Sequence, residues 1–128
     1  MIECITPPGA PAPRGPYSPA VRAGDFVFLS GQGPIDPETN QLLTGDIRQQ
    51  TRLTLGNIQR ILEGSGASRA DVVKCSVFLA DAGDFAAMNE VYAEFFGTHK
   101  PARTTVEAGF VAPGMKVEID CVAWRPKQ

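Results

Sequence analysis

The chain has 128 residues, 43% of them hydrophobic and 20% charged, which allows one globular domain with a buried core. The net charge of −2 gives no electrostatic reason to expect nucleic acid or an anionic membrane as a partner. Three widely spaced cysteines and a single histidine, with no C-x-x-C pair, support neither a disulfide scaffold nor a metal site. The first residues lack the features of a signal peptide, and no apolar run could cross a membrane. We therefore expect one cytoplasmic domain over residues 1–128.

Residues 7–19 contain six prolines and two glycines, which excludes a helix and predicts an extended surface loop. Tyr17 in this loop is interpreted as an anchor that packs the loop down, with a lid over a pocket as the alternative. Two strands follow within residues 20–30, joined by a short turn. Residues 26–29 are apolar on both faces, so we expect this strand to be covered on both sides. Residues 30–34 then break the strand and bring a hydroxyl and glycine backbone to its end.

Helical spacing of apolar residues predicts two helices. The first covers residues 46–62, with Thr44 or Asp46 as the N-cap and glycines after its end. The second covers residues 84–96 and begins at Asp84, a good N-cap residue. Its apolar stripe consists of Phe85, Met88, Val91, Tyr92, Phe95 and Phe96. Asn89 lies one position off this stripe, where most asparagines are solvated or bonded at the helix edge.

Three more strands are predicted from period-2 alternation at residues 71–80, 101–107 and 116–124. In the first, one face carries Val73, Cys75, Val77 and Leu79, and the other carries Val72, Lys74, Ser76 and Phe78. In the second, Arg103, Thr105 and Glu107 share a face. In the third, Lys116, Glu118 and Asp120 lie opposite the apolar face of Val117, Ile119, Cys121 and Ala123. Arg103 and Glu118 are expected to point away from the main core and to carry the function.

The element order is three strands, helix, strand, helix and two strands, which predicts an α+β fold with a mixed sheet. Right-handed crossovers that step the same way place both helices on one face of the sheet. The other face keeps apolar side chains, among them Val72, Phe78, Val122 and Trp124. An open apolar face of this size usually marks a subunit interface, so we predict a homo-oligomer.

Arg103 and Glu118 stand near the starts of two strands that run in opposite directions. Counted from the turn between the strands, they are about six residues apart, or about 20 Å at ~3.3 Å per residue. If they act together, a neighbouring chain must supply one of them. The plainer interpretation is a surface arginine in a weak ion pair and a solvated glutamate.

The chain resembles the RidA/YjgF family of enamine/imine deaminases along nearly its whole length. The matching stretches are Gly15-Pro-Tyr-Ser, Phe28-Leu-Ser-Gly-Gln, Asp84-Phe with Asn89 and Tyr92-x-x-Phe-Phe, Pro101-Ala-Arg, and Val117-Glu-Ile. The resemblance implies a chorismate-mutase-like subunit that forms a homotrimer with clefts between subunits. It also implies hydrolysis of small reactive enamines or imines, such as 2-aminoacrylate, to a keto acid and ammonia without a cofactor.

Carried over by this resemblance, Arg103 would grip the substrate carboxylate through two parallel hydrogen bonds. Glu118 would activate the attacking water, a task that favours a carboxyl group with a raised pKa. Tyr17 would close over the substrate. The cleft would be lined by Ser30, Gly31 and Asn89.

Some positions depart from the family pattern. Thr105 replaces the usual cysteine, so it keeps a polar group but excludes any role for a thiolate there. Pro19 and Gly33 also differ, and the segment before Pro101 is about two residues shorter, which suggests a divergent branch. Alternatives are therefore a non-catalytic small-carboxylate-binding regulator and a deaminase of 2-aminomuconate type. An RNA-acting protein is disfavoured by the mild negative charge.

Overall fold

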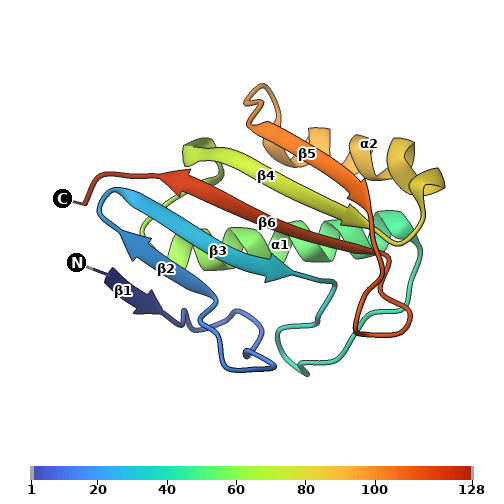
Figure 1. The fold of residues 1–128 in the computed structure, drawn as a ribbon, viewed down its shortest axis with the longest axis horizontal. Helices are drawn as coiled ribbons and strands as arrows, with labels where there is room; N and C mark the ends of the chain where they lie inside the picture. The colour runs from blue at the N-terminus through green and yellow to red at the C-terminus, as the bar shows by residue number, and fades with distance from the viewer. Residues whose placement is uncertain (1, 128) are drawn as a thin grey trace.

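The computed structural model describes residues 2–127 as one mixed six-stranded sheet with two helices packed on one of its faces (Figure 1). The elements in chain order are β1 (Ile2–Ile5), β2 (Ala20–Ala23), β3 (Phe26–Gln32), α1 (Ile47–Gly64), β4 (Val72–Leu79), α2 (Phe85–Phe96), β5 (Ala102–Glu107) and β6 (Val117–Trp124). The sheet order is β1-β2-β3-β6-β4-β5, and only the β4–β5 pair is parallel. The α+β class, the mixed sheet and the placement of both helices on one face are confirmed. The predicted order counted three strands before the first helix but located only two of them, and the third is β1 at the start of the chain.

Helix α1 begins with a capping box, in which Asp46 accepts from the backbone of Gln49 and the Gln49 side chain accepts from the backbone of Asp46. It ends before Gly66, whose φ of +81° suits glycine. Helix α2 differs from the prediction at its start. Asp84 occupies the N-cap position but forms no side-chain cap bond, because a 3₁₀ turn over Ala82–Asp84 precedes the helix. Asp81 caps that turn instead, through the backbone N–H of Gly83.

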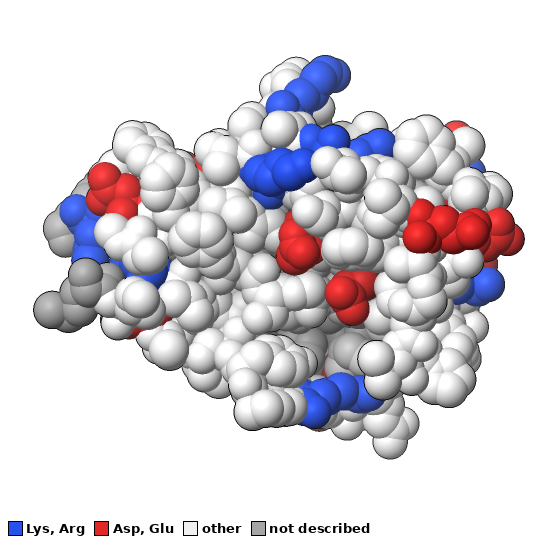
Figure 2. All heavy atoms as spheres, viewed as in Figure 1, with Lys and Arg blue, Asp and Glu red and all other residues white. Residues whose placement is uncertain are grey.

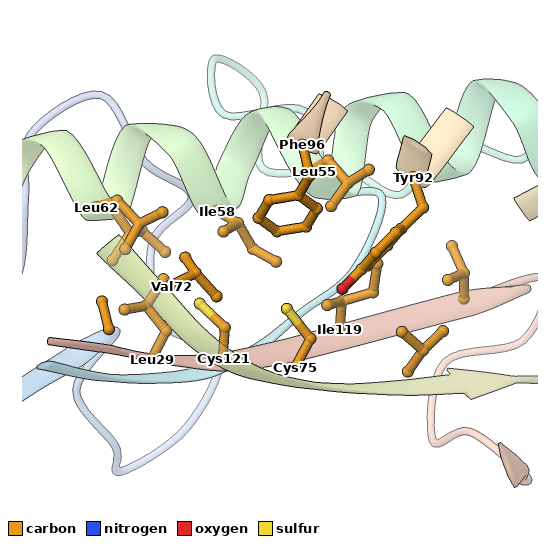
Figure 3. Packing of buried hydrophobic residues seen from close by; sticks show 14 of the residues in the cluster. Leu29, Leu55, Ile58, Leu62, Val72, Cys75, Tyr92, Phe96, Ile119 and Cys121 are labelled. Carbon is orange, nitrogen blue, oxygen red and sulfur yellow. The ribbon is translucent and has the colours of Figure 1, made fainter. Parts of the chain in front are cut away.

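The core lies between the helices and the covered face of the sheet (Figure 3). Leu55, Ile58 and Leu62 of α1 pack down onto Leu29, Ile119 and Cys121 of the strands. Burial of each such large side chain contributes about 1.5–3 kcal/mol. Cys75 and Cys121 face each other across β4 and β6 as free, buried thiols, in keeping with their interpretation as small core residues.

The predicted faces of two β4 residues, Val72 and Val73, are wrong. Val72 is fully buried in the core, whereas Val73 is 42% exposed on the opposite face. The reason is an irregularity in the β4–β6 register between Val72 and Lys74, which adds one residue and reverses the alternation at the start of the strand.

The uncovered face of the sheet is rich in apolar side chains. Phe26, Phe28, Val73, Val106 and Trp124 are all exposed there. Within one chain, β3 is therefore covered only on the side of Val27 and Leu29, and not on both sides as expected. Figure 2 views this face and shows mostly uncharged atoms over the sheet, with most charged groups toward its rim. Among residues 2–127, no helix is both long and apolar enough to span a bilayer.

Candidate functional site

Arg103 lies on the helix side of the edge strand β5. Its register partner in the parallel neighbour β4 is Cys75, whose side chain points into the core beneath the helices. The guanidinium carbon lies 4.7 Å from the centre of the Tyr92 ring and 5.6 Å from that of Phe85, both on α2. Such contacts orient the guanidinium against aromatic faces. The expectation that Arg103 points away from the main core is therefore wrong, because α2 covers this part of the sheet.

Several polar atoms near Arg103 lack a conventional hydrogen-bond partner among the described residues. They are Asn89 Oδ1, Tyr92 Oη and Thr105 Oγ1, and all three are buried. The Tyr92 hydroxyl approaches the Cys75 thiol, a weak partner, and burial raises the pKa of both groups. Because buried polar atoms are normally bonded, these three atoms are exceptions that contacts within residues 2–127 do not explain. We call Asn89, Arg103 and Thr105, with the two α2 rings, the arginine half-site.

Glu118 lies on the uncovered face of β6, directly against Gly31. A Cβ atom added at Gly31 would lie 2.5 Å from Glu118 Oε2, so the carboxylate occupies the space that a side chain would need. The β3–β6 register shifts between Leu29 and Gln32, which sets Ser30 and Gly31 out of the regular ladder. Ser30, Gly31 and Glu118 thus form a second cluster, which we call the glutamate half-site.

The surroundings of Glu118 disfavour its charged form. It is half-buried, its register neighbour on β4 is Phe78, and Asp120 lies two residues along the same face. Burial and, secondarily, the Asp120 carboxylate raise the pKa of Glu118 above its usual range. Such a carboxyl group is suited to exchanging a proton with water or substrate.

Tyr17 belongs to the loop that is hydrogen-bonded to Ser30 of the glutamate half-site through its neighbour Ser18. The Ser30 hydroxyl donates to the Ser18 carbonyl at 2.7 Å, which fixes the Tyr17 loop to the end of β3. Tyr17 is 48% exposed, and its hydroxyl accepts from the backbone N–H of Arg14 at 3.2 Å. The interpretation of Tyr17 as the anchor of this loop is therefore wrong, since the buried residues of the loop are Pro7, Pro11 and Pro19.

The two half-sites do not meet within one chain. Strand β4 lies between β5 and β6, and Arg103 aligns through Cys75 with Cys121, three residues from Glu118. The expected separation of six residues along the strands is wrong, because it assumed that β5 and β6 are neighbours. Arg103 and Glu118 are nevertheless kept apart, because they lie on opposite faces of the sheet.

Sequence reasoning missed three residues that shape these clusters. Phe85 and Tyr92 were interpreted as parts of an apolar stripe, but both also contact Arg103. Asp120 was noted only as a polar position on β6. Its spacing of two residues from Glu118 was the available signal, since alternation puts both carboxylates on one face.

The side chains of the half-sites offer a guanidinium, a carboxyl group, an amide and hydroxyl groups. In the described part of the chain, no group of three or more His, Cys, Asp or Glu side chains is placed to hold a metal ion.

Comparison with known proteins identifies the family. Residues 8–125 match the family described as Endoribonuclease L-PSP. A RutC family protein of Pyrococcus horikoshii is 50% identical, covering 98% of this chain and 99% of that protein. A 2-iminobutanoate/2-iminopropanoate deaminase of Dermatophagoides farinae is 42% identical and covers 92% of both chains. The crystal structure of E. coli TdcF with bound serine matches with a TM-score of 0.90 at 38% identity, over 96% of this chain and 98% of that one. The chain belongs to the RidA/YjgF family.

Proposed function

We propose that this protein is a cofactor-independent deaminase that hydrolyses small enamines or imines of amino acids, such as 2-aminoacrylate. The reaction would take place in a homotrimer, in clefts where the arginine half-site of one subunit faces the glutamate half-site of another. One observation carries the proposal: Arg103 is held against two aromatic rings and forms no ion pair among residues 2–127. A guanidinium presented in this way is suited to a carboxylate from outside the chain.

In the proposed chemistry, the arginine half-site binds the substrate and the glutamate half-site transfers the protons. Arg103 holds the substrate carboxylate, and Asn89 Oδ1 accepts a hydrogen bond from the substrate nitrogen. An enamine first becomes the imine by gaining a proton on its terminal carbon and losing one from its nitrogen. Glu118 of the facing subunit then removes a proton from water as the oxygen attacks the C=N carbon, and returns it to the nitrogen. In the resulting carbinolamine, Glu118 moves the hydroxyl proton to the nitrogen as the C–N bond breaks, which releases ammonia and leaves the keto acid.

The activation barrier that the protein must lower is modest, because imines also hydrolyse without a catalyst. Holding the acid and one water in a productive geometry supplies much of the acceleration. Tyr17 would cover the substrate, and Thr105 would offer a hydroxyl where relatives offer a thiol. The relative from Dermatophagoides farinae, named as an imine deaminase, and the serine bound to E. coli TdcF support a site for amino-acid-like acids.

The test is production of pyruvate and ammonia from 2-aminoacrylate generated in the assay by a serine dehydratase. Arg103→Ala is expected to lower kcat/KM by about 100-fold, the loss of a charge-assisted pair of hydrogen bonds. Arg52→Ala is the matched control, since Arg52 is an exposed arginine of α1 outside both half-sites. Equal activity of wild type and Arg103→Ala, or no activity in either, would contradict the proposal. Binding of 2-oxobutanoate without turnover would favour the non-catalytic alternative.

A further inference from the structure

The pocket beside Arg103 is larger than a three-carbon substrate requires. It has a volume of about 340 Å³ and is lined by Asn89, Tyr92, Ala93, Phe96, Gly97, His99, Lys100, Pro101 and Arg103. At about 30 Å³ for each water of the bulk liquid, this space corresponds to roughly eleven waters. 2-Aminoacrylate has only six non-hydrogen atoms. The arginine half-site therefore has room for a longer substrate side chain.

The lining of this pocket is basic, with no acidic side chain. Neither Lys100 nor Arg103 forms an ion pair with any carboxylate of residues 2–127. His99 contributes less, because its Nε2 donates to the Val72 carbonyl at 2.6 Å and its ring packs edge-on against Phe96. Two permanent cations thus share one pocket. A ligand with two negative charges can pair with both side chains, whereas a ligand with one can pair with only one of them.

Two of the residues that line the pocket also carry buried polar atoms without a conventional partner. Tyr92 is only 8% exposed, yet its hydroxyl has no conventional partner, and the same holds for the buried Oδ1 of Asn89. Both residues line the pocket, together with the apolar walls of Phe96 and Pro101. Such a lining fits a short aliphatic chain with polar groups at its ends.

We infer that this pocket takes enamines or imines with a second carboxylate on the side chain, the class formed from acidic amino acids. Arg103 binds the carboxylate next to the reacting carbon, and Lys100 binds the side-chain carboxylate. The inference rests on the proposed function and narrows its substrate class. Lys100 then acts as a specificity residue, since it contacts a group that monocarboxylate substrates lack.

The experiment compares 2-iminoglutarate with 2-iminobutanoate, each generated in the assay from its amino acid by an amino-acid oxidase. Lys100→Ala is expected to lower kcat/KM for 2-iminoglutarate by about fivefold, the effect of one partly exposed charge pair, and to leave 2-iminobutanoate unchanged. Lys100→Glu should reduce the diacid rate further and Lys100→Arg should preserve it. Lys127→Ala is the matched control, because Lys127 is an exposed lysine that pairs with Glu3 outside this pocket.

The outcomes separate this inference from the proposed function. Turnover of the monoacid with none of the diacid, or equal losses for both in Lys100→Ala, would overturn the inference and leave the deaminase proposal standing. If neither imine is turned over, the deaminase proposal fails. Calorimetry with 2-oxoglutarate and 2-oxobutanoate then decides: a diacid preference that disappears in Lys100→Ala supports the pocket assignment, and equal binding of the two acids refutes it.

Discussion

Glu118 lies against a residue of β3 that has no side chain. The closest approach involves the carboxylate oxygen of Glu118, which is the mobile end of the side chain, and not the backbone of a neighbouring strand. A larger residue at position 31 would therefore displace the carboxylate before it disturbed the sheet. Glycine at position 31 is therefore needed to keep the Glu118 carboxylate in place, and not to keep the sheet folded.

Gly31→Ala is accordingly expected to separate activity from stability. Displacement of the carboxylate by about 1 Å should lower kcat/KM by about 100-fold. The melting temperature should remain that of the wild type, because the Glu118 side chain can swing toward solvent. Gly109→Ala is the matched control, since a Cβ added there would meet no atom within 4 Å and the φ of Gly109 is not positive. Loss of stability in parallel with activity would mean that Gly31 is needed by the sheet itself.

Asp120 is expected to set the pH range over which Glu118 works. A water-activating Glu118 must be ionised, so activity falls as the pH drops through its pKa. Burial and Asp120 both raise that pKa. Asp120→Asn removes the second cause, lowers the pKa of Glu118, and should move the acidic limb of the kcat/KM profile to lower pH. Asp120→Glu should keep the limb in place. A limb that stays in place in Asp120→Asn, or moves to higher pH, would contradict this role.

At the scale of single residues, the alternation of apolar and polar residues correctly predicted the two faces of β6. It placed Glu118 on the face opposite the buried apolar row. It did not predict the face of Arg103, because alternation says which residues share a face and not which face a helix covers. The β5 assignment depended on the neighbour of β5 being β4, and on α2 lying above that edge. Both facts belong to the tertiary structure, and neither can be inferred from the residues of β5.

Helix α1 connects the core to the loops that flank the glutamate half-site. Its fully buried Gln50 donates to the carbonyls of Gly45 and Gly114 and accepts from the backbone N–H of Lys116. Further along the helix, the buried Asn57 donates to the carbonyls of Gly33 and Ile35. Gln50 thus fastens the segment leading into β6, and Asn57 fastens the segment leaving β3. The two strands that carry Glu118 and Gly31 are held by the same helix.

Gln50→Leu is expected to destabilise the fold by about 2–3 kcal/mol, because it leaves buried backbone groups without partners. Chemical denaturation followed by circular dichroism measures this change. Leu53→Ala serves as the control on the same helix, since Leu53 is only half-buried. A loss no larger than that of the control would show that water satisfies the groups that Gln50 now serves.

At the scale of elements, apolar periodicity was sufficient to predict both helices and all the strands except β1, which was given no position in the sequence. It could not predict the irregularity that buries Val72 and exposes Val73. Both residues are valine, so the apolar pattern is the same whichever of the two faces the core. It also could not predict that a 3₁₀ turn would come before α2, because Asp81 and Asp84 are equally good caps by residue type. Gln50 and Asn57 were missed for a related reason: on a helix their residue types suggest polar surface, and only the folded loops supply their partners.

The whole chain presents two separate half-sites and an uncovered apolar sheet face. Arg103 is on the helix side of the sheet and Glu118 on the other, while the uncovered sheet face exposes aromatic residues including Phe28 and Trp124. Packing of further copies against that face would remove both deficiencies. The sequence predicted the apolar face, but not which residues a partner would contribute to the proposed site, since that depends on how whole subunits fit together.

Phe28→Glu is expected to disrupt the assembly. Phe28 is 45% exposed at the centre of the apolar face, and an unpaired charge there would oppose its burial between subunits. Size-exclusion chromatography with light scattering should give three times the mass of one chain for the wild type and one chain for Phe28→Glu. Leu43→Glu, at an exposed leucine beside α1, should leave the mass unchanged. A wild-type protein that elutes as a single chain would refute the assembly.

A mixture of two nearly inactive variants tests whether the site is shared between subunits. Arg103→Ala and Glu118→Gln are each expected to have only a small residual activity alone. In randomly mixed trimers, each cleft takes its arginine from one chain and its glutamate from another, so about one cleft in four has both residues intact. Unfolding and refolding the two variants together should therefore recover about a quarter of the wild-type activity. If one chain supplied both residues to each cleft, no mixture could recover activity. Addition of Phe28→Glu to both variants should abolish the recovery, because chains that do not assemble cannot exchange half-sites.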